Sequence, residues 1–264
     1  ILFLGGLFLY KTKHMDLAGI ISCAGVFSVF FGFMYGSFFG FEDVLKAIWL
    51  KPMNQMMDVP LVGRLNTVFV IAIGFGMFII LICMIFNIIN SIRNKDTEKA
   101  WFDSNAVAGL VFYGSIVLTV GLFISGRKLP ATAVLVVMFG VPLLLMFLKE
   151  PLTNLVEKKS EIFPEQKGMF FVQSFFELFE VLLSYLSNTL SFLRIGAFAV
   201  SHAAMMEVVL MLAGATNGGS PNWIVVVLGN IFVCAMEGLI VGIQVLRLEY
   251  YEIFSRFYAG NGRE

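Results

Sequence analysis

Apolar segments that are long enough to cross a lipid bilayer follow one another along this chain, and they restrict its fold more than any other feature. About 20 consecutive apolar residues in a helix cross the hydrocarbon core of a bilayer. The segments cover residues 1–10, 17–39, 66–91, 106–125, 130–148, 169–213 and 222–258. Only the first is too short, since it forms half a span. The sequence therefore predicts an all-α fold, a polytopic transmembrane helical bundle.

The composition excludes an ordinary soluble domain. Hydrophobic residues make up 59% of the chain and charged residues 14%, whereas soluble domains carry about 45–50% apolar and about 25% charged residues. The 18 basic residues only equal the 18 acidic ones, and no basic stripe indicates a nucleic-acid partner. The two histidines, His14 and His202, lie far apart in the sequence, and no spacing typical of metal ligands occurs. We therefore expect contact with membrane lipid, and no cofactor, metal or nucleic acid.

The basic residues of the loops predict how the chain is oriented. With the 11–16 loop in the cytoplasm, twelve Lys and Arg residues lie inside and five outside, which favours a cytoplasmic C-terminus. The remaining basic residue, Arg194, belongs to neither side. The chain begins with Ile1 inside an apolar segment and has no basic region before it, so we expect a piece of a longer protein rather than a signal peptide.

The last two apolar segments are unusually long. Residues 169–213 contain no proline and are predicted to form one continuous helix. Such a helix would be about 67 Å long, against a hydrocarbon core of about 30 Å. It must tilt steeply, bend or project from the membrane, and so must residues 222–258. The Gly, Asn, Ser and Pro residues at 214–221 predict a tight outer hairpin between two long, steeply tilted C-terminal helices.

Polar residues form a stripe on each of these two helices. Arg194 lies centrally in the first, and its guanidinium keeps its charge at any relevant pH. At 100° per residue, one face within about 60° also holds the other polar residues of that helix. This stripe consists of Glu180, Ser184, Ser187, Ser191, Arg194, Ser201 and His202. On the last helix, Asn230, Glu237 and Gln244 recur every seven residues, and Arg247 lies one turn further on.

Structural alternatives remain open for single members of the stripes. Arg194 could extend its side chain toward an interface, and Glu237 could pair with a basic residue only to join two helices. His202 could be a hydrogen-bonded interior residue, and the serines could bond to their own helix. The stripe as a set is more specific than any of its members.

Three other charged residues are assigned outside the stripes. Glu207 points away from the stripe and is predicted at the outer end of its helix. Glu252 and Arg256 lie near the cytoplasmic end and are predicted on a solvated surface.

The polar stripe indicates ion passage. A fixed positive charge with polar groups on both sides would divide the membrane into two polar paths, neither of which crosses it completely. A carboxylate carried by a partner could lose its ion on one side of Arg194 and be neutralised by the guanidinium while it passes. The same charge would repel cations and so prevent direct leakage between the paths.

Four sequence motifs resemble those of a known family. SYLSNTLSFLRIGAFAVSHAAM, followed by MEGLIVGIQVLRLEYYEIFSRFYAGNG, resembles the membrane region of subunit a, or subunit I, of V-type and archaeal or bacterial A-type rotary ATPases. GVFSVFFGFMYGSFFG and VPLLLMFLKEPL resemble earlier segments of the same family. The resemblance implies that residues 1–264 are a single membrane domain that lacks the family's N-terminal cytosolic domain and first membrane helix. It also implies that residues 169–264 form an ion-path hairpin that faces the proteolipid ring.

The resemblance also implies roles for particular residues. Arg194 matches the arginine that faces the ring's carboxylates, and Arg247 matches the family's second arginine. Glu237 and His202 match residues of the outer half-channel, and Glu180 matches the acid of the cytoplasmic one. Ser184 and Ser187 would line the cytoplasmic path with Glu180. Ser184, Asn188 and Gln244 differ from the eukaryotic pattern, which indicates a prokaryotic member.

The function implied is that of a static membrane subunit without catalytic chemistry of its own, which carries H⁺ or Na⁺ past the rotating ring. The implied partners are the proteolipid ring and, through the cytosolic domain, the peripheral and central stalk subunits. The implied location is a prokaryotic cell membrane.

Two other functions remain open at this stage. A secondary transporter with a mid-membrane site would show inverted repeats and broken helices, and we find no repeat between the two halves of the sequence. A structural anchor for a soluble assembly would have no need of Arg194 and Glu237 deep in neighbouring helices.

Overall fold

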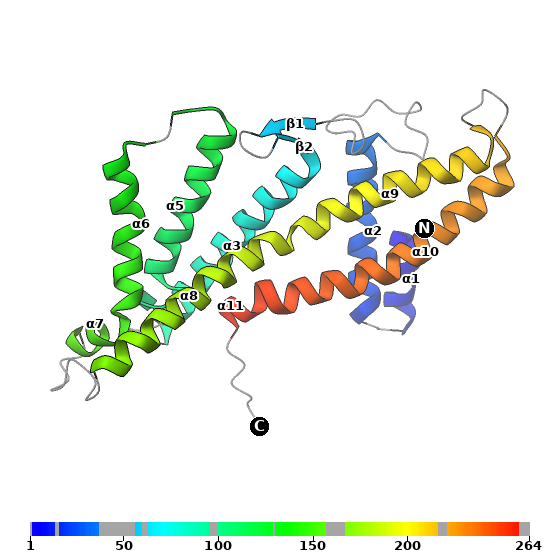
Figure 1. The fold of residues 1–264 in the computed structure, drawn as a ribbon. Coiled ribbons are helices and arrows are strands. Elements are labelled where there is room, and N and C mark those ends of the chain that lie inside the picture. Colours follow the sequence, from blue (N-terminus) through cyan, green and yellow to red (C-terminus); the bar gives the residue numbers. More distant parts are fainter. Residues whose placement is uncertain are drawn as a thin grey trace. The chain divides into compact units, whose positions relative to one another are not determined.

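The computed structural model describes residues 2–13, 16–36, 56–59, 63–94, 100–128, 130–156, 167–215 and 221–258, and it confirms the all-α prediction (Figure 1). One short two-stranded sheet, β1–β2, joins the helices. The elements, in chain order, are α1 Leu2–Lys13, α2 Asp16–Tyr35, β1 Met56–Val59, β2 Gly63–Asn66, α3 Thr67–Arg93, α5 Val107–Ile124, α6 Thr132–Phe147, α7 Lys149–Val156, α8 Lys167–Ser191, α9 Leu193–Leu212, α10 Trp223–Leu248, the π-helix η2 Glu249–Phe254, and α11 Ser255–Phe257.

The apolar segments of the sequence correspond to these helices. Within the described ranges, five stretches are long and apolar enough to cross a membrane: Ala18–Tyr35, Thr67–Arg93, Val107–Ile124, Gly168–Leu212 and Trp223–Phe257. Helices α6 and α7 qualify only as a pair, which bends by 72°. Helix α1 has 12 residues and remains the short segment that the sequence indicated.

The chain divides into two compact units. The first unit comprises residues 1–57, 66–68 and 197–239, and the second comprises residues 58–65, 69–196 and 240–264. Helices α9 and α10 contribute residues to both units.

Small residues and helix caps shape the first unit. Gly6 of α1 approaches α2 so closely that a Cβ there would lie 2.7 Å from the backbone nitrogen of Ser22. Such close approach is typical of membrane helices that pack through small residues.

Two asparagines cap the beginnings of α3 and α10. Oδ1 of Asn66 accepts a hydrogen bond from the backbone N–H of Val68 at 3.0 Å, and Oδ1 of Asn222 accepts one from the backbone N–H of Ile224 at 3.1 Å, as N-cap residues do.

Helices α9 and α10 pack against each other in the first unit through Met206, Val209 and Val233. Gly214 has a φ of +75°, which ends α9 in the manner of a C-terminal glycine cap. The N–H of Asn222 then donates to the carbonyl of Ala213 at 2.9 Å. This bond joins the two ends of the hairpin predicted at 214–221, of which residues 216–220 lie outside the described part.

The second unit has a larger core. Helices α3, α5 and α8, the junction of α8 and α9, and the end of α10 bury eight side chains together: Met77, Ile80, Met84, Phe112, Tyr113, Tyr185, Phe192 and Leu248. Helix α5 also packs on α6, and α6 on α7 and α8. Inside this core the hydroxyls of Tyr113 and Thr189 lie 2.7 Å apart, so the buried phenol keeps a hydrogen-bond partner.

The long segment predicted over 169–213 is present as a stretch of 45 residues, Gly168–Leu212, but it is two successive helices rather than one. The break lies at Phe192, which is fully buried. Its N–H bonds to the carbonyl of Thr189 at 3.3 Å, and its own carbonyl accepts from Ile195 at 3.0 Å. These are the tighter i to i+3 bonds of a 3₁₀ turn. The side chain of Phe192 packs onto Gly76 of α3, so a tertiary contact accompanies the break.

We expect Gly76→Ala to lower the thermal unfolding midpoint of the purified protein. A Cβ at Gly76 would lie 2.5 Å from Cβ and Cδ2 of Phe192, and overpacking of this kind costs about 1–3 kcal/mol. The matched control is Gly74→Ala, two residues earlier in α3, where a Cβ meets no atom within 4 Å. Alanine also favours a helix over glycine, so the control should not lower the midpoint. Equal midpoints for the two variants would contradict this account of the junction.

Candidate functional site

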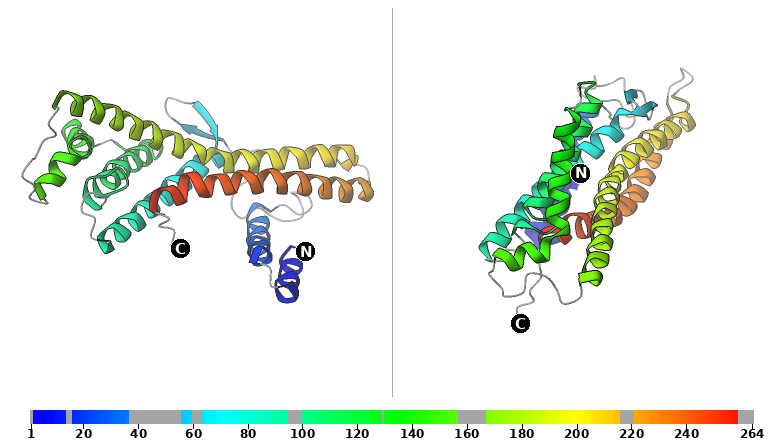
Figure 2. Two further views of the ribbon diagram at one scale, coloured as in Figure 1. Left: turned by 90° about the horizontal axis from the view of Figure 1, so that it is seen from below. Right: turned by 60° about the vertical axis from the view of Figure 1, so that its left-hand side comes forward.

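Arg194 lies two residues after the break, where the end of α10 runs beside the junction of α8 and α9 (Figure 2). Its Nη1 donates to the backbone carbonyl of Gln244 at 3.2 Å, and its Nη2 donates to Oγ of Ser191 at 3.1 Å. The side chain is half-buried. A guanidinium has five N–H donors, and the described residues accept from only these two nitrogens. No described residue accepts from the remaining donors.

Ser191 also bonds to Glu252, which the sequence placed on a solvated surface. That prediction is wrong, because Glu252 is only 6% exposed. The hydroxyl of Ser191 donates to Oε1 of Glu252. The other carboxylate oxygen, Oε2, is buried and has no hydrogen-bond partner among the described residues. Ser191 therefore links a buried carboxylate to the Arg194 guanidinium.

The prediction for Arg256 is wrong in the same way, since this residue is 5% exposed. Its Nη1 donates to Oδ1 of Asn105 at 3.0 Å, and its Cζ lies 5.6 Å from the centre of the Tyr185 ring. A guanidinium over an aromatic ring gains a cation–π interaction. The Asn105 amide and the Tyr185 ring thus replace part of the hydration that the guanidinium loses, whereas its Nε is buried and has no hydrogen-bond partner among the described residues.

The sequence prediction for both residues rested on their position near the cytoplasmic end of the last segment, without use of the helical period. In the structure Glu252 lies in the π-helix η2 and Arg256 in α11, which follows it. One signal was available: Leu248, Glu252 and Arg256 recur every four residues, and all three are buried.

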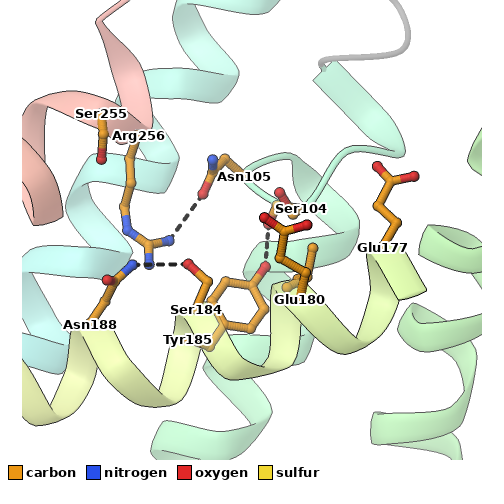
Figure 3. Close-up of a pocket in the computed structure, with 10 residues that line it drawn as sticks. Ser104, Asn105, Glu177, Glu180, Ser184, Tyr185, Asn188, Ser255 and Arg256 are labelled. Atoms are coloured by element: carbon orange, nitrogen blue, oxygen red, sulfur yellow. Dashed lines mark hydrogen bonds between the residues drawn. The ribbon is translucent and has the colours of Figure 1, made fainter. Parts of the chain in front are cut away.

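A polar cavity of about 350 Å³ lies in the second unit between α8, residues 104–105 and the end of the chain's last helical segment (Figure 3). Its lining consists of Ser104, Asn105, Glu177, Glu180, Val181, Ser184, Tyr185, Asn188, Ser255 and Arg256. The cavity brings together Glu180 and Ser184, two residues of the predicted cytoplasmic path. Ser187 is exposed on α8 and is not part of this lining.

The charges of the cavity are arranged unevenly. Lys149 of α7 forms an ion pair with Glu177 at one side, whereas Glu180 forms no ion pair with a described residue. Arg256 closes another side of the lining (Figure 3). Asn188 donates to Oγ of Ser184 at 3.2 Å. Glu180 is thus the cavity's acid whose charge no described cation neutralises.

Several of these residues could not have been found in the sequence. Ser104 accepts a hydrogen bond from the hydroxyl of Tyr185, and Asn105 accepts one from Arg256. Both belong to the connection before α5 and carry no periodic signal. Only the packing of α5 against α8 brings them to the cavity.

His202 and Glu237, which the sequence stripes singled out, meet in the first unit. Nδ1 of His202 lies 2.5 Å from Oε2 of Glu237. The second oxygen of Glu237, Oε1, is buried and has no described hydrogen-bond partner. Helices α9 and α10 therefore present a His–carboxylate pair with one carboxylate oxygen uncommitted.

The remaining members of the stripes make fewer hydrogen bonds and ion pairs with other segments. Arg247 is exposed and makes no hydrogen bond or ion pair with any described residue, so its support of Arg194 stays a prediction. Gln244 serves Arg194 through its backbone carbonyl. Ser201 and Asn230 bond to carbonyls of their own helices at 3.1 Å and 2.9 Å, which is the structural alternative for such residues. Glu207 is exposed, and its place away from the stripe stays a prediction.

Within the described part of the chain, no three His, Cys, Asp or Glu side chains lie together as metal ligands.

Comparison with known proteins finds similarity to subunits of A-type ATP synthases and of a V-type ATPase. The chain is 27% identical over 265 aligned residues to the A-type ATP synthase subunit I of Pyrococcus abyssi, a match that covers 96% of the chain and 36% of that protein. It is 41% identical over 95 residues to the A-type ATP synthase subunit I of Saccharolobus solfataricus, covering 33% of the chain and 14% of the relative. It is 31% identical over 119 residues to the human V-type proton ATPase 116 kDa subunit a 3, covering 40% and 14%. No protein-family model matches the chain. The chain thus spans about a third of the length of the relative that it matches from end to end.

We expect a cysteine at position 184 to react faster than one at position 187 with a charged, membrane-impermeant thiol reagent. Ser184 lines the polar cavity and Ser187 does not. Because the thiolate is the reactive form and needs a polar surrounding, the rate should differ at least about tenfold. The comparison uses Ser184→Cys and Ser187→Cys in a background where Cys23, Cys83 and Cys234 are replaced by alanine. Equal rates would contradict the expectation that the cavity gives position 184 a more polar surrounding than position 187.

Proposed function

Because the chain is homologous to subunit I of A-type ATP synthases and to subunit a of V-type ATPases, we propose that it is the static membrane subunit of a rotary ion-translocating ATPase. In this proposal the chain provides two ion half-channels and a fixed arginine, and other subunits handle ATP. The observation that carries it is the setting of Arg194: a permanent charge held in an apolar helix, with donors left over for a partner.

Arg194 separates the half-channels in this proposal. The guanidinium stays charged at any relevant pH, and its attachment to Ser191 and to the α10 backbone fixes where that charge lies. A carboxylate of the rotating proteolipid ring would be stabilised by the remaining N–H donors as it passes. A cation on its way from one half-channel to the other would be repelled, since charge interactions are strong where water is excluded.

The polar cavity serves as the cytoplasmic half-channel. Glu180 supplies its acid, with Ser184 and Asn188 as polar neighbours. Glu177 is neutralised by Lys149, which leaves Glu180 as the group that attracts and releases the ion.

The His202–Glu237 pair serves the outer half-channel. The uncommitted oxygen of Glu237 can accept a proton or contact a cation while His202 holds the other oxygen. Arg247 and Gln244 would assist at the arginine site. The transported ion is H⁺ or Na⁺, and the carboxylate site of the ring selects between them.

Location and partners follow from the same proposal. The C-terminus lies in the cytoplasm of a prokaryotic cell, the helices cross its plasma membrane, and the proteolipid ring packs against the hairpin formed by residues 169–264. The peripheral and central stalk subunits bind the cytosolic part that the longer relatives possess.

We expect Arg194→Gln to abolish ATP-driven ion uptake by the complete ATPase complex reconstituted in lipid vesicles. Glutamine keeps some hydrogen bonds but removes the fixed charge, so ring carboxylates lose their partner and the barrier to leakage disappears. Uptake of H⁺ is followed by a pH-sensitive dye and uptake of Na⁺ by a radioactive tracer, in each case per assembled complex. Arg127→Gln, at an exposed arginine that follows α5, is the control and should leave uptake unchanged. Normal uptake by Arg194→Gln would refute the proposed role.

A further inference from the structure

A line of hydrogen bonds leads from Arg194 to a carboxylate that no part of the proposed function uses. Arg194 Nη2 donates to Ser191 Oγ at 3.1 Å, and Ser191 Oγ donates to Oε1 of Glu252. The three residues belong to α9, α8 and η2, so the line joins three helical segments of the second unit at one hydroxyl.

The chemistry of the three groups gives this line a direction. A guanidinium can only donate hydrogen bonds, and an ionised carboxylate can only accept them. A serine hydroxyl has one proton and two lone pairs. Because Glu252 takes the proton, Ser191 presents its lone pairs to Arg194. Without an acceptor at position 252, the hydroxyl could rotate and turn its proton toward the guanidinium, which repels it.

We propose that Glu252 is a positioning residue for Arg194: it fixes the rotation of the Ser191 hydroxyl, which in turn fixes the guanidinium beside the path of the ring carboxylates. This proposal rests on the proposed function, in which Arg194 meets those carboxylates. Glu252 itself touches neither the ion nor the ring.

Two features of Glu252 support the assignment. The residue is 6% exposed, and a buried carboxylate is costly unless it is paired or hydrogen-bonded. Ser191 is also the hydrogen-bond partner that the described residues give this carboxylate, because Oε2 has none. Glu252 also belongs to the π-helix η2, and π-helical turns occur frequently at functional sites.

The rival explanation is that Ser191 and Glu252 stabilise the structure independently of each other, without acting on Arg194. The two explanations differ in how substitutions combine. If Glu252 acts on Arg194 only through Ser191, then removing both residues does no more harm than removing one. If each residue supports the structure separately, the two losses multiply.

The test compares Ser191→Ala, Glu252→Met and the double variant in the complete complex, with ATP-driven ion uptake measured per assembled complex. Methionine has nearly the length of glutamate and suits an apolar site. We expect each single variant to lose uptake about tenfold, since a misplaced charged group at a reacting centre costs at least that much. The double variant should take up ions at the same rate as the less active of the two single variants. A further tenfold loss in the double variant, or wild-type uptake in either single variant, would overturn the proposal.

Two further variants complete the design. Glu252→Gln retains an oxygen that accepts from Ser191, so it should keep uptake within about twofold of the wild type. If it is as inactive as Glu252→Met, charge rather than the hydrogen bond matters and the proposal fails. Glu249→Gln, three residues earlier in η2 and without a described hydrogen bond, is the matched control and should be unaffected. If Glu252→Met does not assemble, then Ser191→Ala and Glu252→Gln decide the outcome.

Failure of this inference can be told from failure of the proposed function. Normal uptake by Arg194→Gln would refute the function itself. Loss of uptake by Arg194→Gln, with wild-type uptake by Ser191→Ala and Glu252→Met, would refute only the positioning role of Glu252.

Discussion

The permanent charge of Arg194 within an apolar helix is the constraint on which the rest of the site depends. A guanidinium cannot neutralise itself by losing a proton, so the fold must supply acceptors where lipid or apolar side chains would otherwise lie. The acceptors come from two directions, a serine at the end of α8 and a backbone carbonyl of α10. Both are in reach only because the junction of α8 and α9 lies against α10.

The packing of the second unit holds that junction. Phe192 fills the space above Gly76 of α3, and Leu248 of α10 joins the same core. Apolar contacts thereby fix the positions from which polar groups act. The buried charges of Glu252 and Arg256 collect at the same end of α10, each with a hydrogen-bond partner from another segment. A substitution that weakens the packing of these helices would therefore also displace the polar groups, since the same helices carry both.

Much of this could be predicted from residue spacing. The apolar segments correspond to the helices, and the 100° period correctly grouped Arg194 with Ser191, and Glu180 with Ser184. It also placed His202 and Glu237 on faces that meet. The prediction failed for Glu252 and Arg256, which were assigned to a solvated surface because they lie near the cytoplasmic end, although both are buried. Ser104 and Asn105 lie outside the stripes and reach the cavity only through long-range packing.

The sequence by itself determined which segments cross the membrane and which ionisable residues must be accommodated among them, because hydropathy and charge are properties of the residues alone. The tertiary structure decided which groups satisfy those charges. It interrupts the long segment at Phe192, whose ring needs the space that Gly76 leaves, and it brings Glu252 within hydrogen-bond reach of Ser191. Both effects depend on contacts between residues far apart in the chain, and no local period records such contacts.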